Sequence, residues 1–323
     1  MNCSKDPWLR RFVWIWLAAI GQVSFGATGI LPVQAQASGD TNRPPLIVAG
    51  SYPAYCLAVK AAGPLARIEV VGGTETGPHG HQLTPSELRK LEEARLVVLL
   101  GLGLEGWAEK YRAMRGSRTS PVIVECAAGL SAELITGDDR HGHAPGEGHE
   151  HASAGFNPHI WLDPVLARHA VRNIERALVQ TFPEQADAFR KQARAGEAEL
   201  ETLHQQIESA LKEVRIRKVV TYHDAFPYFF KRFQLQSADV VQPQADASPT
   251  PRTLARLAKR MREEKIRVVF TEPQFNPAHA QRLARDLGVE TASLDTLETG
   301  ELDPRHYDRA MLLNARTLAR FLR

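Results

Sequence analysis

The chain has 323 residues, of which 43% are apolar and 24% charged, so it is long enough and apolar enough to build two hydrophobic cores. Its formal net charge is +3, and removal of residues 1–37, which hold three basic residues and one acidic residue, would leave 286 residues and a charge of +1. A nearly neutral chain is not typical of nucleic-acid binding, and we expect no nucleic-acid partner.

The first 37 residues have the features of a secretory signal peptide. Lys5 and Arg10 precede the apolar run 12–20, and residues 35–37, Ala-Gln-Ala, offer a small-residue cleavage site. The apolar run is shorter than the about 20 residues that a membrane-spanning helix needs. We therefore predict a signal peptide at residues 1–37 and an exported mature protein.

Short apolar runs alternate with helical patterns along both halves of the chain. In the first half, a helical pattern at residues 84–94 lies among the runs 45–50, 66–73, 95–101 and 121–127. In the second half, the runs are 218–223, 237–241, 267–272 and 290–295. Such runs are typical of buried parallel strands. We predict an α/β fold of two lobes, each with a parallel-type sheet flanked by helices.

One uninterrupted helical pattern lies between the two sets of runs. Residues 184–213 contain no proline and carry apolar or small residues at helical spacing: Phe189, Ala193, Gly196, Leu200, Leu203, Ile207 and Leu211. A helix of this length spans about 45 Å, enough to reach both lobes. We expect one long rigid helix, residues 183–214, to join an N-terminal lobe, residues 44–182, to a C-terminal lobe, residues 215–323.

The segment GLGLEG, residues 101–106, matches the spacing of a dinucleotide-binding motif, and Glu125 lies about 20 residues further on. The pattern fixes few residues, and here it follows the third expected strand and not the first. We therefore favour a tight turn between a strand and a helix over a nucleotide site.

A histidine-rich segment, HGHAPGEGHEH at residues 141–151, has the composition of a loop. Its glycines and proline interrupt helices and strands, and it has no apolar face to bury. Imidazole is a common ligand for borderline metals, which favours a metal-contacting loop over residues 138–152. Its four histidines are candidate auxiliary ligands: His141, His143, His149 and His151.

Further candidate ligands follow expected strands or lie in loops. They are His79, His159, His223 and Asp295, with Glu272 as a reserve carboxylate. Each residue alone has an ordinary structural explanation, but together they fall where open α/β sheets bind ligands, outside the carboxyl ends of the strands. Three imidazoles and one carboxylate suit Zn²⁺ better than Mn²⁺, which prefers more oxygen ligands.

These motifs together resemble a known family, the solute-binding receptors that deliver zinc or manganese to ABC-type importers, and they are closest to its zinc-specific branch. The segments PHGHQLTPSEL, NPHIWLDP, YHDAFPYF and TEPQFNP and the final SLD occur in the family's order across nearly the whole mature chain. The resemblance implies four metal ligands, His79, His159, His223 and Asp295. His81 stands where the family often has an aromatic residue and is a further candidate auxiliary ligand.

The resemblance also implies a function. We expect a monomeric receptor in the periplasm, not an enzyme, which captures Zn²⁺ with high affinity and hands it to an ABC permease of the cytoplasmic membrane. The connecting helix would allow only a small tilt of the lobes. The His-rich loop would collect zinc as an auxiliary site.

Two other functions stay open from the residues alone. A secreted zinc-dependent hydrolase would hold the metal with three protein ligands and an activated water, with Glu272 as general base. A periplasmic zinc buffer would bind the ion without a transporter. The pairing of Cys56 and Cys126 is open too, because two cysteines in an oxidising compartment can form a bridge or stay buried as thiols.

Overall fold

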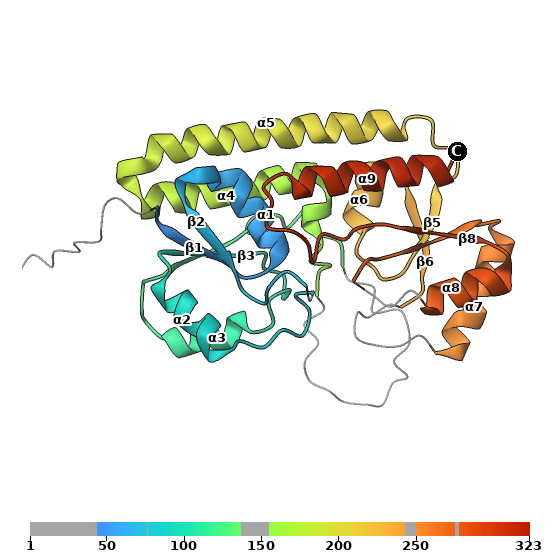
Figure 1. Cartoon of the computed structure of the whole chain (residues 1–323), viewed down its shortest axis with the longest axis horizontal. Helices are drawn as coiled ribbons and strands as arrows, with labels where there is room; N and C mark the ends of the chain where they lie inside the picture. Colours follow the sequence, from blue (N-terminus) through green and yellow to red (C-terminus); the bar gives the residue numbers. More distant parts are fainter. Residues whose placement is uncertain (1–43, 76, 137–154, 243–249, 275–277) are drawn as a thin grey trace, which may run out of the picture. The chain divides into compact units, whose positions relative to one another are not determined.

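The computed structural model describes residues 44–75, 77–136, 155–242, 250–274 and 278–323, all within one structural unit (Figure 1). The signal peptide predicted at residues 1–37 and the His-rich loop predicted at residues 138–152 lie outside the described residues. None of the described helices has both the length and the apolar character that a membrane-spanning helix requires.

The first sheet consists of four parallel strands in the order β2-β1-β3-β4. They are β1 (Leu46–Ala49), β2 (Arg67–Val70), β3 (Leu96–Leu99) and β4 (Val122–Glu125). Each lies within one of the apolar runs, so these four predictions are confirmed. The strand order reverses between β1 and β3, and a reversal of this kind opens a crevice at the carboxyl ends of the strands.

Helices cover both faces of this sheet, which is why its strands are mostly apolar. They are α1 (Tyr52–Ala62), α2 (Pro85–Glu93), α3 (Ala108–Arg115) and α4 (Pro164–Thr181), with short 3-10 turns at Gly63–Leu65 and Ile160–Leu162. Ile47 and Leu96 pack in one core with α1 and α4, whereas Val48 and Val97 pack in another with α2 and α3. Successive strand residues therefore face opposite cores.

The second sheet repeats this arrangement with parallel strands in the order β6-β5-β7-β8. They are β5 (Lys218–Thr221), β6 (Gln236–Val240), β7 (Val268–Thr271) and β8 (Glu290–Ser293). Side chains of α6 (Pro227–Arg232) and α9 (His306–Phe321) fill the core on one face, and those of α7 (Pro251–Glu263) and α8 (Ala278–Leu287) fill the core on the other. The second predicted sheet is confirmed as well.

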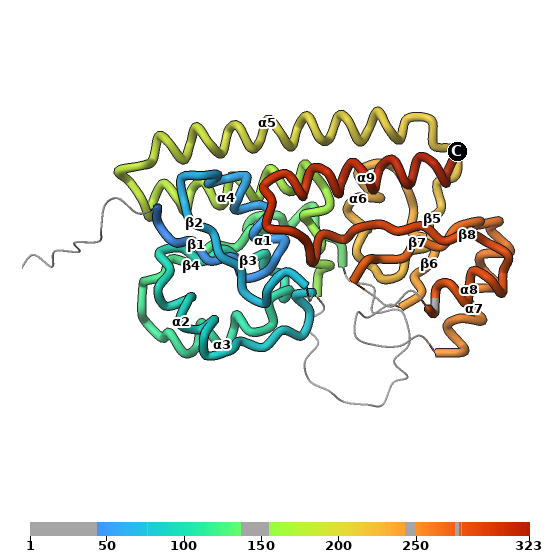
Figure 2. The backbone as a smooth tube through the Cα atoms, in the orientation of Figure 1, coloured from blue at the N-terminus to red at the C-terminus, as the bar shows by residue number. Residues whose placement is uncertain are grey.

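A single long helix, α5 (Ala186–Leu211), packs against α1, α4 and α9 (Figures 1 and 2). It follows a 3-10 turn at Pro183–Gln185, and its 26 residues span about 39 Å. All seven residues of the predicted stripe are buried, and all except Gly196 belong to a core that includes residues of both sheets. The long helix is confirmed, two residues shorter at each end than the pattern. The lobe boundaries stay a prediction.

Helices α1 and α5 approach most closely at Gly196. A Cβ atom added there would lie 2.3 Å from the carbonyl oxygen of Lys60 in α1. The buried ammonium of Lys60 lies 2.6 Å from Glu199 in α5 and 2.6 Å from Asp308 in α9. The glycine thus permits the contact between the backbones, and the lysine links three helices.

The GLGLEG segment forms the turn between β3 and α3. Gly101 and Gly103 have φ angles of +85° and +80°, a left-handed backbone that favours glycine. The buried carboxylate of Glu105 accepts hydrogen bonds from backbone N–H groups of the same turn, while Glu125 pairs with Arg112. The interpretation as a turn is confirmed.

The two cysteines in the described part of the chain are buried and unpaired. Cys56 lies in α1, and Cys126 follows β4. Burial raises the pKa of the Cys56 thiol to about 12 and raises that of Cys126 well above its usual value. The two residues therefore pack as small apolar side chains and form no bridge.

Candidate metal centre

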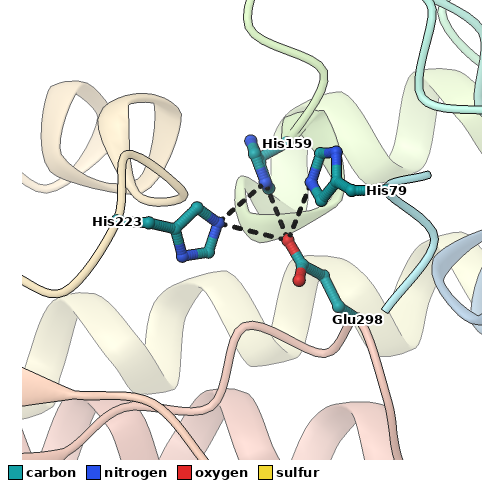
Figure 3. Close-up of side chains that lie close together, drawn as sticks. All are labelled: His79, His159, His223 and Glu298. Carbon is teal, nitrogen blue, oxygen red and sulfur yellow. Dashed lines mark hydrogen bonds and ion pairs between the residues drawn. The ribbon is translucent and has the colours of Figure 1, made fainter. Parts of the chain in front are cut away.

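Four side chains from separate connections meet at one point (Figure 3). His79 lies between β2 and α2, and His159 immediately precedes the 3-10 turn that leads into α4. His223 follows β5 by two residues, and Glu298 follows β8. One nitrogen or oxygen atom of each lies within 4.8 Å of the others, and no second group of this kind occurs among the described residues.

One carboxylate oxygen of Glu298 faces the three imidazoles. Its Oε1 lies 2.9 Å from His159 Nε2, 3.3 Å from His79 Nε2 and 3.3 Å from His223 Nε2. The Nε2 atoms of His159 and His223 are 3.3 Å apart. Two ligands that bind Zn²⁺ at 2.0–2.1 Å in tetrahedral geometry are themselves about 3.3 Å apart. These distances therefore match those that a tetrahedral zinc ion requires.

The centre is closed on most sides. The side chains of His159 and His223 are 4% exposed and that of Glu298 is 1% exposed, whereas that of His79 is 27% exposed. An ion that enters beside His79 would exchange its water shell for protein ligands in a buried site.

Hydrogen bonds orient two of the histidines. His159 Nδ1 lies 2.8 Å from Asn157 Oδ1, which can only accept, so Nδ1 carries the proton. His223 Nδ1 donates to the Glu272 carboxylate, which also accepts the His223 backbone N–H at 2.9 Å. This arrangement directs Nε2 to the centre, as partners of metal-bound histidines do. Glu272, the predicted reserve carboxylate, thus orients a histidine and lies outside the group of four.

Burial and charge act differently on the two buried histidines. Burial lowers the pKa of His159 to about 4 despite its contact with Glu298, so this imidazole is neutral at neutral pH. Burial also disfavours the charge on His223, but Glu272 and Glu298 outweigh it and raise the pKa well above its usual value. The histidines in turn outweigh burial at Glu298 and hold its pKa well below its usual value. Without a metal, His223 and Glu298 therefore form an ion pair.

The connections that carry His159 and His223 are hydrogen-bonded to each other. Asn157 Nδ2 donates to the Asp224 carbonyl at 2.7 Å, and the Tyr228 hydroxyl donates to the Asn157 carbonyl at 2.8 Å. The asparagine of the NPH motif thus orients one imidazole and holds the loop of another. This fixes the separation of two histidines from different halves of the chain.

The structure brings Glu298, and not Asp295, to the three histidines. Asp295 Oδ1 accepts the backbone N–H of Leu297 at 2.7 Å, and its Oδ2 lies 3.7 Å from His306 Nε2. Aspartate often bonds the backbone two residues ahead in this way and thereby stabilises a turn. The predicted position of Asp295 is corrected: it shapes the turn that carries the chain to the carboxylate of the centre.

His81, another predicted candidate, is not part of the group of four. His81 Nε2 lies 3.2 Å from Glu87 Oε2 in α2, so its partner is a neighbouring carboxylate. The auxiliary histidines of the loop 138–152 lie outside the described residues. Glu298 and Asn157 were not predicted, although both stand within three residues of a predicted ligand.

A family model described as the periplasmic zinc-uptake complex component A, ZnuA, matches residues 47–321. This chain belongs to the ZnuA family. The ZnuA description names a component of an uptake complex, which is not a class of enzyme, and places the family in the periplasm. The family resemblance seen in the sequence is confirmed.

Two curated relatives carry zinc in their names. The zinc-binding lipoprotein AdcA of Streptococcus pneumoniae (strain ATCC BAA-255 / R6) is 29% identical over 269 residues, or 82% of this chain and 52% of AdcA. The high-affinity zinc uptake system protein ZnuA of Bacillus subtilis (strain 168) is 26% identical over 252 residues, or 78% of each chain. The chain therefore spans about half the length of AdcA.

Solved structures of the ZnuA type have the same fold. A crystal structure of ZnuA matches with a TM-score of 0.71 at 25% identity and covers 86% of this chain and 99% of that one. A mutant structure of the laminin-binding adhesin Lmb from Streptococcus agalactiae matches with a TM-score of 0.72, also at 25% identity, and covers 86% and 99%. The predicted fold class, two parallel sheets flanked by helices and joined by a long helix, is confirmed.

Proposed function

We propose that this chain is a high-affinity receptor that captures Zn²⁺ outside the cytoplasmic membrane and delivers it to an ABC permease. The observation that carries the proposal is the convergence of Glu298 Oε1 and the imidazole nitrogens of His79, His159 and His223, with Oε1 2.9–3.3 Å from all three nitrogens, as ligands of a tetrahedral zinc ion are spaced. Membership of a zinc-uptake family and the names of the relatives support it.

In the proposed cycle, Zn²⁺ loses its water and is bound by three Nε2 atoms and one oxygen of Glu298. The ion displaces the proton on His223 Nε2, because a coordinating imidazole must be neutral. No bond of a substrate breaks. Because α5 packs against both halves of the chain, release at the permease involves a small tilt rather than a wide opening.

A hydrolase fits the geometry less well. A catalytic zinc site keeps one position open for an activated water, whereas here four protein atoms are already spaced as a closed site. Glu272, the residue that would act as general base, is hydrogen-bonded to His223. The proposal therefore includes no catalytic role. Absence of hydrolytic turnover by the zinc-loaded protein tests this part.

A competition titration with a zinc chelator tests the metal site. We expect the mature protein to bind about one Zn²⁺ tightly and Mn²⁺ more weakly. His159→Ala should weaken the tight site more than 100-fold, since loss of an outer partner of a ligand already costs about 10–100-fold. His169→Ala is the matched control, because His169 Nε2 contacts the Ala128 carbonyl at 2.7 Å, away from the centre. Unchanged affinity in His159→Ala would refute the proposed site.

The His-rich loop is proposed as an auxiliary zinc collector. A glycine-rich segment loses backbone entropy when it closes on an ion, so its affinity should be below that of the packed site. Deletion of residues 139–152 should remove weaker zinc equivalents and slow loading at scarce zinc, while the tight site survives. No change in stoichiometry or loading would make the loop a spacer, and loss of the tight site would contradict both views.

The cellular part of the proposal concerns export and the partner. Residues 1–37 would direct the chain to the periplasm, so their deletion should leave the protein in the cytoplasm on cell fractionation. Zinc uptake that requires both this protein and a permease would separate a receptor from a zinc buffer. We also expect the mature protein to sediment as a monomer and not to bind DNA.

A further inference from the structure

Gln274 lies between the two buried carboxylates beside the metal centre. Its amide nitrogen Nε2 is 3.2 Å from Glu272 Oε2 and 3.2 Å from Glu298 Oε2. The same nitrogen donates to Thr296 Oγ1 at 2.7 Å, which anchors it to the segment that carries Glu298. A single neutral donor therefore contacts both acidic side chains of this region.

The contact divides the two oxygens of Glu298 between different partners. Oε1 faces the histidines, with His159 Nε2 at 2.9 Å, while Oε2 is turned to the amide of Gln274. An amide N–H donates and cannot bind a cation, so the oxygen that it holds is kept for a hydrogen bond. The carboxylate then offers one oxygen to an ion and not two.

We propose that Gln274 is a specificity-determining residue, which keeps Glu298 a one-oxygen ligand and so favours four-coordinate Zn²⁺ over ions that take more oxygen ligands. Tetrahedral sites suit Zn²⁺, whereas Mn²⁺ prefers octahedral sites rich in oxygen. A released Glu298 could bind through both oxygens and raise the coordination number. The inference rests on the proposed zinc function and goes beyond it, because it assigns ion choice to a residue that does not bind the ion.

A purely structural role would have a different effect. Gln274 also touches Glu272, the carboxylate that accepts from His223 Nδ1. If Gln274 only held Glu272 in position, loss of its amide would weaken the binding of Zn²⁺ and of Mn²⁺ by the same factor. The ratio of the two affinities therefore separates ion choice from general support.

The test compares Gln274→Met with Gln205→Met. Methionine keeps the length of glutamine and removes the amide donor. Gln205, exposed on α5, also donates to a carboxylate, Glu201 Oε1 at 3.1 Å, so it is the matched control. In Gln274→Met we expect Zn²⁺ affinity to fall about 10–100-fold, as for other outer partners of metal ligands. Mn²⁺ affinity should stay the same or rise, so that the preference for zinc drops about tenfold or more.

Bound Co²⁺ gives a second measurement. Four-coordinate Co²⁺ absorbs visible light much more strongly than five- or six-coordinate Co²⁺, so the absorption should weaken in Gln274→Met and stay strong in the parent and in Gln205→Met. Thr296→Val removes the anchor of the amide and should shift the ion preference in the same direction. It also serves as the test if Gln274→Met does not fold.

Unchanged zinc-to-manganese preference and Co²⁺ absorption in the folded variants would overturn the role of Gln274. An equal loss for both ions would overturn it too and leave a supporting role. Failure of the parent protein to bind zinc tightly would instead refute the proposed function, so the two failures are distinguishable.

Discussion

Replacement of Gly196 by alanine tests the close contact between α1 and α5. In an open helix this change stabilises by about 1 kcal/mol, because glycine is a poor helix former. Here the new Cβ would lie 2.3 Å from the Lys60 carbonyl oxygen and 2.9 Å from its carbonyl carbon, both backbone atoms. Overpacking of this kind costs about 1–3 kcal/mol. Because the contact is so short, the upper part of that range applies, and we expect a net destabilisation of about 1–2 kcal/mol.

Urea unfolding of the metal-free protein measures this effect. The midpoint should fall while the slope stays the same, since the folded core is otherwise unchanged. By heating, the midpoint should drop by about 2–8 °C, at about 2–4 °C per kcal/mol for a chain of this size. Ser209→Ala, on the exposed face of the same helix, is the control and should stabilise slightly. A stabilised Gly196→Ala variant would refute the argument that α1 and α5 need a glycine there.

Three further predictions concern the metal centre. Glu298→Gln should weaken zinc binding more than 100-fold and Asp295→Asn much less, and a chelator competition with the reverse order would contradict the assignment of the carboxylate. Zinc binding should release about one proton near neutral pH, because the raised pKa keeps His223 protonated without metal whereas His159 is already neutral. Affinity should accordingly fall up to about tenfold per pH unit as the pH drops below the pKa of His223, and calorimetry in buffers of different ionisation enthalpy measures the proton. His223→Glu should shift the ion preference toward Mn²⁺, as measured by side-by-side titration with Zn²⁺ and Mn²⁺. A parent protein that already prefers Mn²⁺ would contradict this interpretation of His223.

Periodicity was sufficient to predict the eight strands and the long helix of the described part of this fold. The stripe from Phe189 to Leu211 follows the 3.6-residue period over seven positions, and each of these residues is buried. The inner strands β1, β3, β5 and β7 are buried on both faces, so each reads as a short apolar run bounded by turn residues. Such patterns depend on local geometry and can therefore be recognised in a single sequence. The close approach of α5 and α1 at Gly196 depends on tertiary packing and could not be predicted from the sequence.

The metal centre was only partly predictable for the same reason. Three histidines could be found because each stands at a strand end or in a marked motif. The choice between Asp295 and Glu298 depends on one turn, in which the first carboxylate bonds the backbone N–H of Leu297 and so is not available to the centre. The available signal was an aspartate in an expected turn, because aspartate there often accepts the backbone N–H two residues ahead. Gln274 gave no signal, because an amide in a loop has no pattern of its own.

Chemical labelling of the two buried cysteines measures how often the folded protein opens. Cys56 and Cys126 are buried, and their raised pKa values leave almost no reactive thiolate in the folded state. A thiol reagent should therefore label each of them only when the surrounding helices and strands separate, so the labelling rate follows the opening of the first half of the chain. Zinc, which stabilises the folded state that binds it, should slow this labelling in proportion to its occupancy. The native protein thus reports metal loading through its own thiols, with no engineered residue.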